Sequence, residues 1–263
     1  MRSFTKEILL SLKLLGEFKL KSAVAAYKLI DGKKIEPTIR QMMYYLVKKG
    51  YIQKKRLPGG VCFYLTGSGL NVISEIDKLI FPDHSNWNMK WKLVFFDIPE
   101  VKRSLRDKFR RELKKLGFGM LQNGVWFTPI ISSEQISETI KKSKVEKYTV
   151  IFSGKFEDFT ISPELLEEKF KIKSLIKEFS SLSNKINNLF SKVGISGLSS
   201  NQKLIGKIIL RNRFRLLLSN LIRRLPPLPD KILPGKKIIH KTFSEYEKIR
   251  KLTTQELFKD RIN

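Results

Sequence analysis

The stretch between Pro37 and Leu65 constrains the fold most, because a helix pattern in it passes directly into a hairpin pattern. Pro37 suits the first turn of a helix, and Gly50 is a usual signal for a helix end. Three apolar side chains between them have the spacing of one buried helix face: Ile39, Met43 and Leu46. The sequence therefore predicts a helix from Pro37 to about Lys49, with a polar face opposite the apolar one.

A basic hairpin follows this helix. Residues 51–56 and 61–65 are its predicted strands, and the turn Pro58-Gly59-Gly60 gives it a flexible tip. Two helices precede this region, one with an apolar stripe over residues 8–15 and one over residues 22–30, and Thr66 would cap a fourth helix. Three helices followed by a basic hairpin is the order of a winged helix-turn-helix, which we expect over residues 1–80.

The polar face of the third helix and the hairpin are the candidate DNA contacts. Arg and Gln can hydrogen-bond to base edges in the major groove, Tyr can reach phosphates, and a basic wing can contact the backbone or the minor groove. The candidate residues are Thr38, Arg40, Gln41, Tyr44, Tyr45, Lys48, Lys54, Lys55 and Arg56. The alternative is an exposed polar helix on a winged helix that binds another protein.

The overall charge favours a polyanionic partner. The chain has 52 Lys and Arg against 25 Asp and Glu, a formal net charge of +27. Cationic side chains that neutralise phosphates release condensed counterions, which favours binding to nucleic acid. A chain rich in Lys, Ile and Asn is also what an AT-rich genome would produce. Since the excess extends beyond residues 1–80, either DNA contacts extend further or part of the charge reflects genome composition.

The middle of the chain predicts a second domain over residues 87–158. Its pattern is strand 91–96, helix 101–116, strands 118–121 and 125–129, helix 132–144 and strand 148–152. Asn123-Gly124 is a strong signal for a tight hairpin turn, and Ser132 or Ser133 would cap the second helix. This βαββαβ order is that of a ferredoxin-like domain. The turn-rich stretch 81–86 and the change of pattern at 159–163 mark its limits.

The last part of the chain, residues 162–263, predicts a C-terminal α-helical domain. Helices are expected over 163–179, 201–224 and about 243–258, with a proline-rich link over 225–234. The expected fold class is therefore α+β, with an N-terminal winged helix-turn-helix, a central ferredoxin-like βαββαβ domain and the helical C-terminal domain.

The sequence gives little support for catalysis or a cofactor. Cys62 is the single cysteine and lies in an apolar run, so we expect a small core residue and no disulfide or cysteine-rich zinc site within the chain. His84 and His240 belong to no catalytic motif, and no phosphate-binding glycine pattern is present. The three tryptophans are expected in the core or at an interface. We expect no enzyme activity and no cofactor.

The chain is expected to be cytoplasmic and without a membrane partner. No apolar run reaches the roughly 18 to 20 residues that a membrane span needs. Its N-terminus alternates charged and apolar residues, unlike a signal peptide.

Motifs along nearly the whole chain resemble the PaaX-type transcriptional repressors, the regulators of phenylacetic acid degradation. They are IRQMMYYLVKKGY from Ile39, YLTGSG from Tyr64, WKLVFFDIPE from Trp91, LRDKFRRELKKLGFGMLQNGVWFTP from Leu105 and RLPPLPDKILPG from Arg224. The resemblance implies a homodimeric repressor whose winged helices bind a palindromic operator in double-stranded DNA. It further implies a dimerising central domain and C-terminal helices that hold a small-molecule effector site; the best-known member of the family answers an aryl-CoA thioester.

The chain departs from the family pattern at three places. Tyr45 stands where the family usually has a positively charged residue, so we expect the contacts to bases to differ at this position. Pro234 is followed by Gly235-Lys236-Lys237-Ile238 where the family usually carries a tryptophan. The effector site that the resemblance implies therefore lacks this tryptophan here. The first central strand ends in Asp97-Ile98-Pro99-Glu100 instead of Ser-Ile-Pro-Glu.

Asp97 is the candidate metal ligand. The central segment is also similar to the small CRISPR-associated endonuclease, the partner of the spacer integrase, which carries an aspartate at the end of its first strand. Two such carboxylates across a dimer interface could hold Mg²⁺ and activate water. The simpler interpretation is a polar residue that ends a strand or caps the helix near Pro99.

Two functions therefore rival the regulator. One is a metal-dependent nuclease or CRISPR-adaptation subunit built on the central domain. The other is a nucleic-acid-binding scaffold that has no operator.

Overall fold

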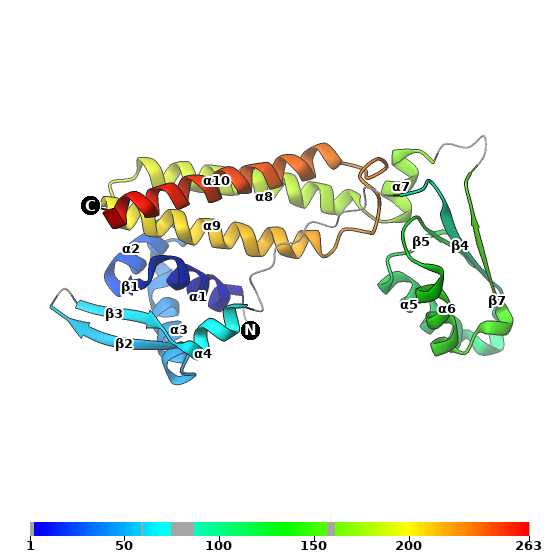
Figure 1. The fold of residues 1–263 in the computed structure, drawn as a ribbon, viewed down its shortest axis with the longest axis horizontal. Coiled ribbons are helices and arrows are strands. Elements are labelled where there is room, and N and C mark those ends of the chain that lie inside the picture. Colours follow the sequence, from blue (N-terminus) through cyan, green and yellow to red (C-terminus); the bar gives the residue numbers. More distant parts are fainter. Residues whose placement is uncertain (1–2, 59, 75–86, 157–160, 263) are drawn as a thin grey trace. The chain divides into compact units, whose positions relative to one another are not determined.

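The computed structural model describes residues 3–58, 60–74, 87–156 and 161–262, with side chains as far as Lys259 (Figure 1). Gly59, His84 and the predicted boundary stretches 81–86 and 159–160 lie outside the described residues. The described chain combines helices with two small antiparallel sheets, so the α+β class is confirmed. Within these residues, every helix is too short or too polar to cross a membrane.

Contacts divide the chain into two compact units. Unit 1 consists of Met1–Ile80, Phe179–Asn220 and His240–Asn263. Unit 2 consists of Phe81–Glu178 and Leu221–Ile239. The residues of the predicted segment 162–263 are thus shared between the two units, because parts of its helices pack on the first 74 residues and its proline-rich link packs on the central sheet.

The first 74 residues of unit 1 form helices and a three-stranded sheet around one core. The elements are α1 (Ser3–Leu15), β1 (Glu17–Lys19), α2 (Leu20–Asp31), a 3₁₀ turn (Lys33–Ile35), α3 (Glu36–Lys48), β2 (Ile52–Leu57), β3 (Gly60–Leu65) and α4 (Gly67–Ser74). The bounds of α3, β2 and β3 agree with the predicted bounds to within one residue. The Thr66 hydroxyl accepts a hydrogen bond from the Gly69 N–H at 3.1 Å, as expected of a capping residue.

The sheet of unit 1 has the strand order β1-β3-β2, and both pairings are antiparallel. Phe18 of β1 lies opposite Phe63 of β3, and both side chains are buried. Their core also takes Ile39 from α3 and Ile209 from α9 (Ser200–Ile222), a helix that begins more than a hundred residues further along the chain. The three-residue strand β1 was not predicted, because it is too short for an alternating pattern to be recognised.

Most of three long helices completes unit 1: α8 (Lys173–Ile195), α9 and α10 (Lys236–Ile262). They lie side by side, and α9 runs next to α1 and α2 (Figure 1). Buried hydrogen bonds join these segments, among them Asn212 Nδ2 to Ser11 Oγ at 3.1 Å. The last helix begins earlier than predicted, at Lys236, directly after Gly235 with a φ of +68°.

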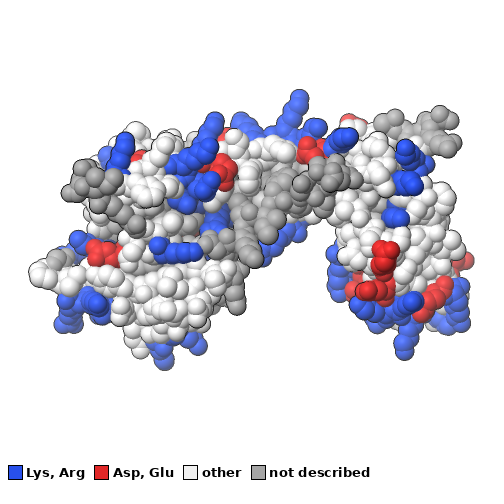
Figure 2. Space-filling view, in the orientation of Figure 1, with Lys and Arg blue, Asp and Glu red and all other residues white. Residues whose placement is uncertain are grey.

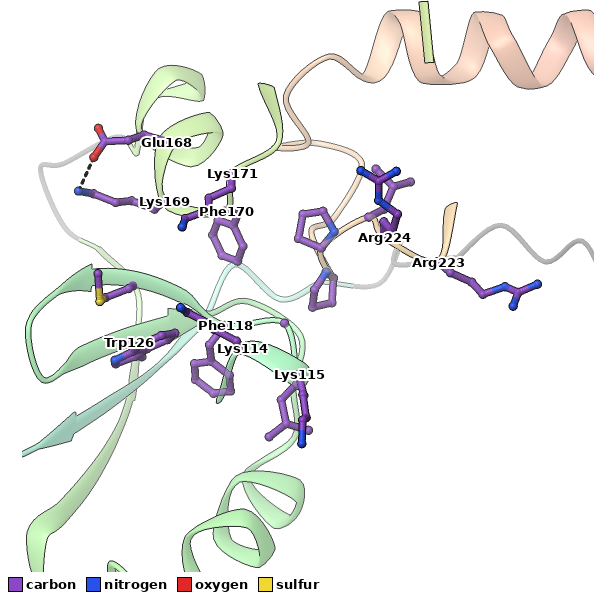
Figure 3. Close-up of a pocket in the computed structure, with 16 residues that line it drawn as sticks. Lys114, Lys115, Phe118, Trp126, Glu168, Lys169, Phe170, Lys171, Arg223 and Arg224 are labelled. Atoms are coloured by element: carbon purple, nitrogen blue, oxygen red, sulfur yellow. Dashed lines mark hydrogen bonds and ion pairs between the residues drawn. The ribbon is translucent and has the colours of Figure 1, made fainter. Parts of the chain in front are cut away.

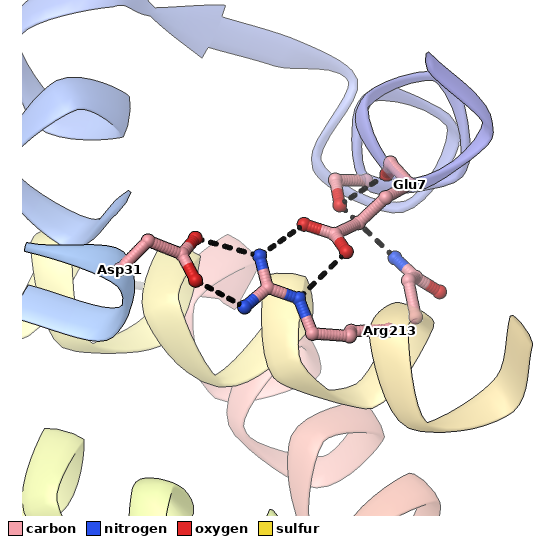
Figure 4. Close-up of polar contacts among 5 residues, drawn as sticks. Glu7, Asp31 and Arg213 are labelled. Atoms are coloured by element: carbon pink, nitrogen blue, oxygen red, sulfur yellow. Dashed lines mark hydrogen bonds and ion pairs between the residues drawn. The ribbon is translucent and has the colours of Figure 1, made fainter. Parts of the chain in front are cut away.

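An ion triad joins α9 to the N-terminal helices (Figure 4). The Arg213 guanidinium donates to both Glu7 oxygens of α1, at 2.8 and 2.9 Å. It also donates to both Asp31 oxygens at the end of α2, at 2.7 and 2.8 Å. Burial raises the pKa of the Glu7 carboxyl, and the neighbouring Arg213 offsets part of that increase. The triad therefore neutralises a buried carboxylate and fixes three helices against one another.

Unit 2 is built around a four-stranded antiparallel sheet with the strand order β5-β6-β4-β7. Its elements are β4 (Trp91–Phe96), a 3₁₀ turn (Glu100–Lys102), α5 (Arg103–Lys115), β5 (Gly119–Gln122), β6 (Val125–Thr128), α6 (Ser133–Ser143), a 3₁₀ turn (Glu146–Tyr148), β7 (Thr149–Gly154) and α7 (Pro163–Lys169). Ser132 begins α6 with a capping box: its hydroxyl accepts from the Gln135 N–H, and the Gln135 side chain accepts from the Ser132 N–H.

The two faces of this sheet are covered differently. Trp126 and Val94 point into a core with Phe109 of α5 and Ile136 of α6. On the other face, residues such as Trp91 and Phe127 pack with Leu166 of α7, and with Ile232 from the proline-rich link. The link therefore belongs to the packing of unit 2.

The helix predicted over 163–179 is two helices in the structure. Lys171 has a φ of +56°, a left-handed conformation that ends α7 before α8 begins at Lys173. The Ile172 N–H donates to the Glu167 carbonyl at 3.0 Å, and the Ile172 side chain is buried. This hydrogen bond and the apolar anchor explain why a lysine takes a conformation that usually favours glycine.

Candidate nucleic-acid interface

The helix α3 is positioned by its ends and by one buried face. Pro37 lies in its first turn, and Gly50 follows its C-terminal cap with a φ of +70°. Ile39, Met43 and Leu46 are its buried side chains, as predicted. Because these three residues fix the helix against the core of unit 1, the opposite face is held towards solvent.

All nine candidate DNA-binding side chains are exposed. They are Thr38, Arg40, Gln41, Tyr44, Tyr45 and Lys48 on α3 and Lys54, Lys55 and Arg56 on β2. Tyr44 is 70% exposed and Tyr45 is 44% exposed, and neither ring is needed by the core. Figure 2 shows Lys and Arg side chains gathered over the hairpin and at the C-terminal end of α3.

A hollow between α3 and the hairpin brings three of these residues together. Arg40, Tyr44 and Lys54 line it, and its volume is about 280 Å³. Its floor is apolar and includes Val47 and Phe63. The residues come from two elements that are adjacent in sequence but meet only because β2 folds back beside α3.

The remaining candidates lie on other faces of the same two elements. Side chains alternate along a strand, so Lys54 and Arg56 share one face of β2 and Lys55 lies on the other. The Lys55 ammonium is 5.2 Å from the centre of the Tyr64 ring, close enough for a cation–π contact. On α3, Gln41, Tyr45 and Lys48 follow one another at helical spacing beyond the hollow. The structure therefore distributes the nine candidate side chains over more than one face of α3 and β2.

Arg40 has an acidic partner that the sequence analysis missed. Its guanidinium donates to Glu36 Oε1 at 2.6 Å from Nη2 and 3.0 Å from Nε, and Lys28 of α2 also pairs with Glu36. The Lys28 and Arg40 hydrogen bonds lower the pKa of the Glu36 carboxyl. The four-residue spacing of Glu36 and Arg40 on a helix could have indicated this pair. A phosphate or base that binds Arg40 must compete with Glu36.

Two basic residues of α2 extend the surface. Lys21 and Lys28 line a second hollow of about 470 Å³ together with Arg40, Gly60 and Val61. Periodicity alone gave no reason to assign them to the interface, because their place beside α3 depends on how α2 packs.

The candidate metal ligand of unit 2, Asp97, directly follows the last residue of β4. Asp97 is exposed, and its backbone N–H donates to the Tyr148 carbonyl at 3.0 Å. Within the described parts of the chain, no three His, Cys, Asp or Glu side chains come together as a metal site would need. Cys62 is buried, and His240 is exposed at the surface of α10.

Comparison with known proteins points to one family. Residues 84–166 match the family described as "PaaX protein central Cas2-like domain". The search of curated proteins gives no match. Among solved structures, the uncharacterized protein Rv0674 from Mycobacterium tuberculosis is 15% identical, with a TM-score of 0.47 over 97% of each chain.

The family match lies in the segment that carries the motifs from Trp91 and Leu105, and it includes β4, α5, β5, β6, α6 and β7. For this central segment, the resemblance to PaaX-type regulators is confirmed by its match to the PaaX central Cas2-like domain.

Proposed function

We propose that the protein is a PaaX-like DNA-binding transcriptional regulator that acts in the cytoplasm as a dimeric repressor of a local operon. In this proposal the first 74 residues are a winged helix-turn-helix, α3 is the recognition helix, and the β2–β3 hairpin is the wing. A small-molecule effector would relieve repression, as the family resemblance implies.

The observation that carries the proposal is the surface of α3 and β2. A helix whose inner face is buried presents six polar or aromatic side chains outwards, beside a strand with three consecutive cations. Such a helix fits the width of the major groove, and the cations of the hairpin would lie against phosphates. Exposed tyrosines next to lysines are also suited to contacts with the sugar-phosphate backbone.

Dimerisation through the central domain is supported by an apolar patch on its sheet. β7 is an edge strand, and Val150 and Phe152 on it are 65% and 54% exposed. Phe95 of β4 lies opposite Val150 and is also exposed, so these side chains share one face. A second copy of the chain would cover them, and a two-fold dimer would present two recognition helices to a palindromic operator.

Selection of bound fragments from a pool of random duplexes tests this function. The wild-type protein is expected to enrich one motif with two inverted half-sites. Arg40→Ala is expected to reduce discrimination at one or two base pairs by about 10-fold, because an arginine that reads a base contributes at one position. Lys54→Ala combined with Lys55→Ala is expected to weaken all duplexes alike, with the motif unchanged.

A pair of lysines on α6 gives the matched control. Lys141→Ala with Lys142→Ala removes the same charge from unit 2 and should leave the motif and the affinity close to wild type. Enrichment of no motif would contradict an operator-binding regulator and favour a non-specific scaffold. If the control variant on α6 lost as much affinity as the hairpin variant, the role proposed for the hairpin would be refuted.

A further inference from the structure

Unit 2 contains a pocket of about 630 Å³ whose lining includes none of the candidate DNA-binding residues (Figure 3). It is formed where α5 turns into the edge strand β5, and it is closed by the end of α7 and by the proline-rich link. Its size falls in the range of pockets that bind small molecules, about 300 to 1,000 Å³. All residues that line it belong to unit 2.

Two glycines, Gly117 and Gly119, allow close packing in the walls of this pocket. Gly117 has a φ of +89°, and a Cβ atom there would lie 2.3 Å from Pro227 Cδ. At Gly119 a Cβ atom would lie 2.9 Å from the Phe170 ring. The two glycines therefore let the proline-rich link and the end of α7 approach β5, and the pocket is a built feature of the unit.

The pocket is strongly cationic. Lys114, Lys115, Lys169, Lys171, Arg223 and Arg224 line it, against Glu168 as the one acidic lining residue. Three of these cations have acidic partners: Lys169 pairs with Glu168, Lys115 with Glu112, and Arg224 with both oxygens of Glu178. The side chain of Arg223 extends away from the other labelled side chains (Figure 3).

Lys114 and Lys171 are the cations of the pocket best able to receive a new anion. Both side chains are exposed, and neither forms an ion pair within the described parts of the chain. They come from the end of α5 and from the left-handed turn after α7, so a ligand that binds both would bridge two walls.

The rest of the lining is apolar and aromatic. Phe118, Trp126, Phe170 and Pro227 are among the residues that line the pocket. The Trp126 side chain is 1% exposed, and its indole Nε1–H has no hydrogen-bond acceptor among the described residues. A buried donor without an acceptor is uncommon in folded proteins, and a bound oxygen would satisfy it.

We propose that this pocket binds a small organic anion in which a phosphate or carboxylate group is joined to a flat apolar group. The anionic group contacts Lys114 and Lys171, and the apolar group packs against Phe118 and Phe170. An inorganic anion would use only the first part of the site, and an uncharged aromatic would use only the second. This proposal does not depend on DNA binding.

Isothermal titration of the full chain with three probes tests the site: phenyl phosphate, inorganic phosphate and benzyl alcohol. Phenyl phosphate is expected to bind at least about 10-fold more tightly than either of the others, because it alone meets both sets of groups. Benzoate forms a fourth arm, which distinguishes a carboxylate from a phosphate ligand. Lys114→Gln with Lys171→Gln should weaken phenyl phosphate binding by at least about 10-fold, and Lys141→Gln with Lys142→Gln on α6 should leave it unchanged.

The indole N–H resonances give a second measurement that needs no substitution. Phenyl phosphate should shift the Trp126 indole signal, whereas the signal of Trp87, whose Nε1–H already donates to the Lys90 carbonyl at 2.8 Å, should not move. Affinity for phenyl phosphate no greater than for inorganic phosphate would overturn the proposal. Equal weakening by the two double variants, or an unmoved Trp126 signal at saturation, would overturn it as well.

Discussion

Replacing Arg213 by methionine removes the guanidinium that joins Glu7 and Asp31 and keeps much of the aliphatic stem. The Glu7 carboxylate is then left without its cation in a place where its side chain is only 4% exposed. Asp31 is more open, with a side chain that is 27% exposed, so water can solvate it. The cost of the substitution therefore comes mainly from Glu7.

The expected destabilisation of Arg213→Met is about 3 kcal/mol. Breaking a buried ion pair by removing one partner costs about 3 to 5 kcal/mol. The lower end applies because Arg213 itself is 18% exposed and some water can reach the site. Replacing Glu7 by leucine in the same chain removes the unpaired charge, so the double variant should recover a large part of this loss.

The loss should depend on pH. Burial raises the pKa of Glu7 above its usual value of 4.5, and without Arg213 this pKa rises further. Below pH 4.5, Glu7 is protonated in both the folded and the unfolded chain, and no charge is buried. As the pH rises through the raised folded pKa, the unfolded chain releases its proton more readily, and stability is lost. The deficit of the variant is therefore smaller at pH 4 than at pH 7.5.

Urea unfolding followed by circular dichroism at pH 4 and pH 7.5 measures these effects. Arg224→Met is the matched control, because Arg224 also meets both oxygens of a carboxylate, Glu178, but at the surface. It should change stability far less than Arg213→Met, since exposed pairs contribute little. Equal losses for the two variants, or a deficit that does not change with pH, would refute the role assigned to the triad.

Three further predictions concern unit 2. Ser132→Ala removes the capping box with Gln135 and should lower stability by about 1 kcal/mol in urea unfolding; no change would mean that the cap contributes nothing. Gly117→Ala places a Cβ atom at a residue with positive φ and against the Pro227 ring, so it should lower stability by about 2 kcal/mol; a neutral result would contradict the close contact described above. The wild-type protein, incubated with labelled DNA or RNA and Mg²⁺, should cleave no more than the Asp97→Ala variant does. Cleavage that this substitution abolishes would favour the nuclease alternative.

Local patterns were sufficient to predict most elements. The helix α3 and the hairpin followed from residues close in sequence, namely Pro37, the Ile39–Met43–Leu46 spacing and Gly50. The cap at Ser132 was also predictable, because it depends on the residues that follow it directly. The same patterns predicted that the nine candidate DNA-binding side chains would be exposed.

Features that depend on distant contacts were not predictable from these patterns. The helix α9 packs on α1 through contacts such as that of Arg213 with Glu7, which are 206 residues apart in sequence. Glu36 was not predicted as the partner of Arg40, because the predicted helix began at Pro37, whereas α3 begins at Glu36. The pocket of unit 2 could not be foreseen, because the proline-rich link reaches Gly117 only in the folded chain.

The salt dependence of duplex binding tests the central claim most directly. Fluorescence anisotropy titrations between 50 and 200 mM salt give the slope of log affinity against log salt for the wild type, for Lys54→Gln with Lys55→Gln, and for Lys141→Gln with Lys142→Gln. Each lost phosphate contact should reduce the slope by about 0.9, so the hairpin variant should lose about 2 units and the α6 variant none. A hairpin variant with the wild-type slope, or equal reductions for the two variants, would contradict DNA binding through this surface.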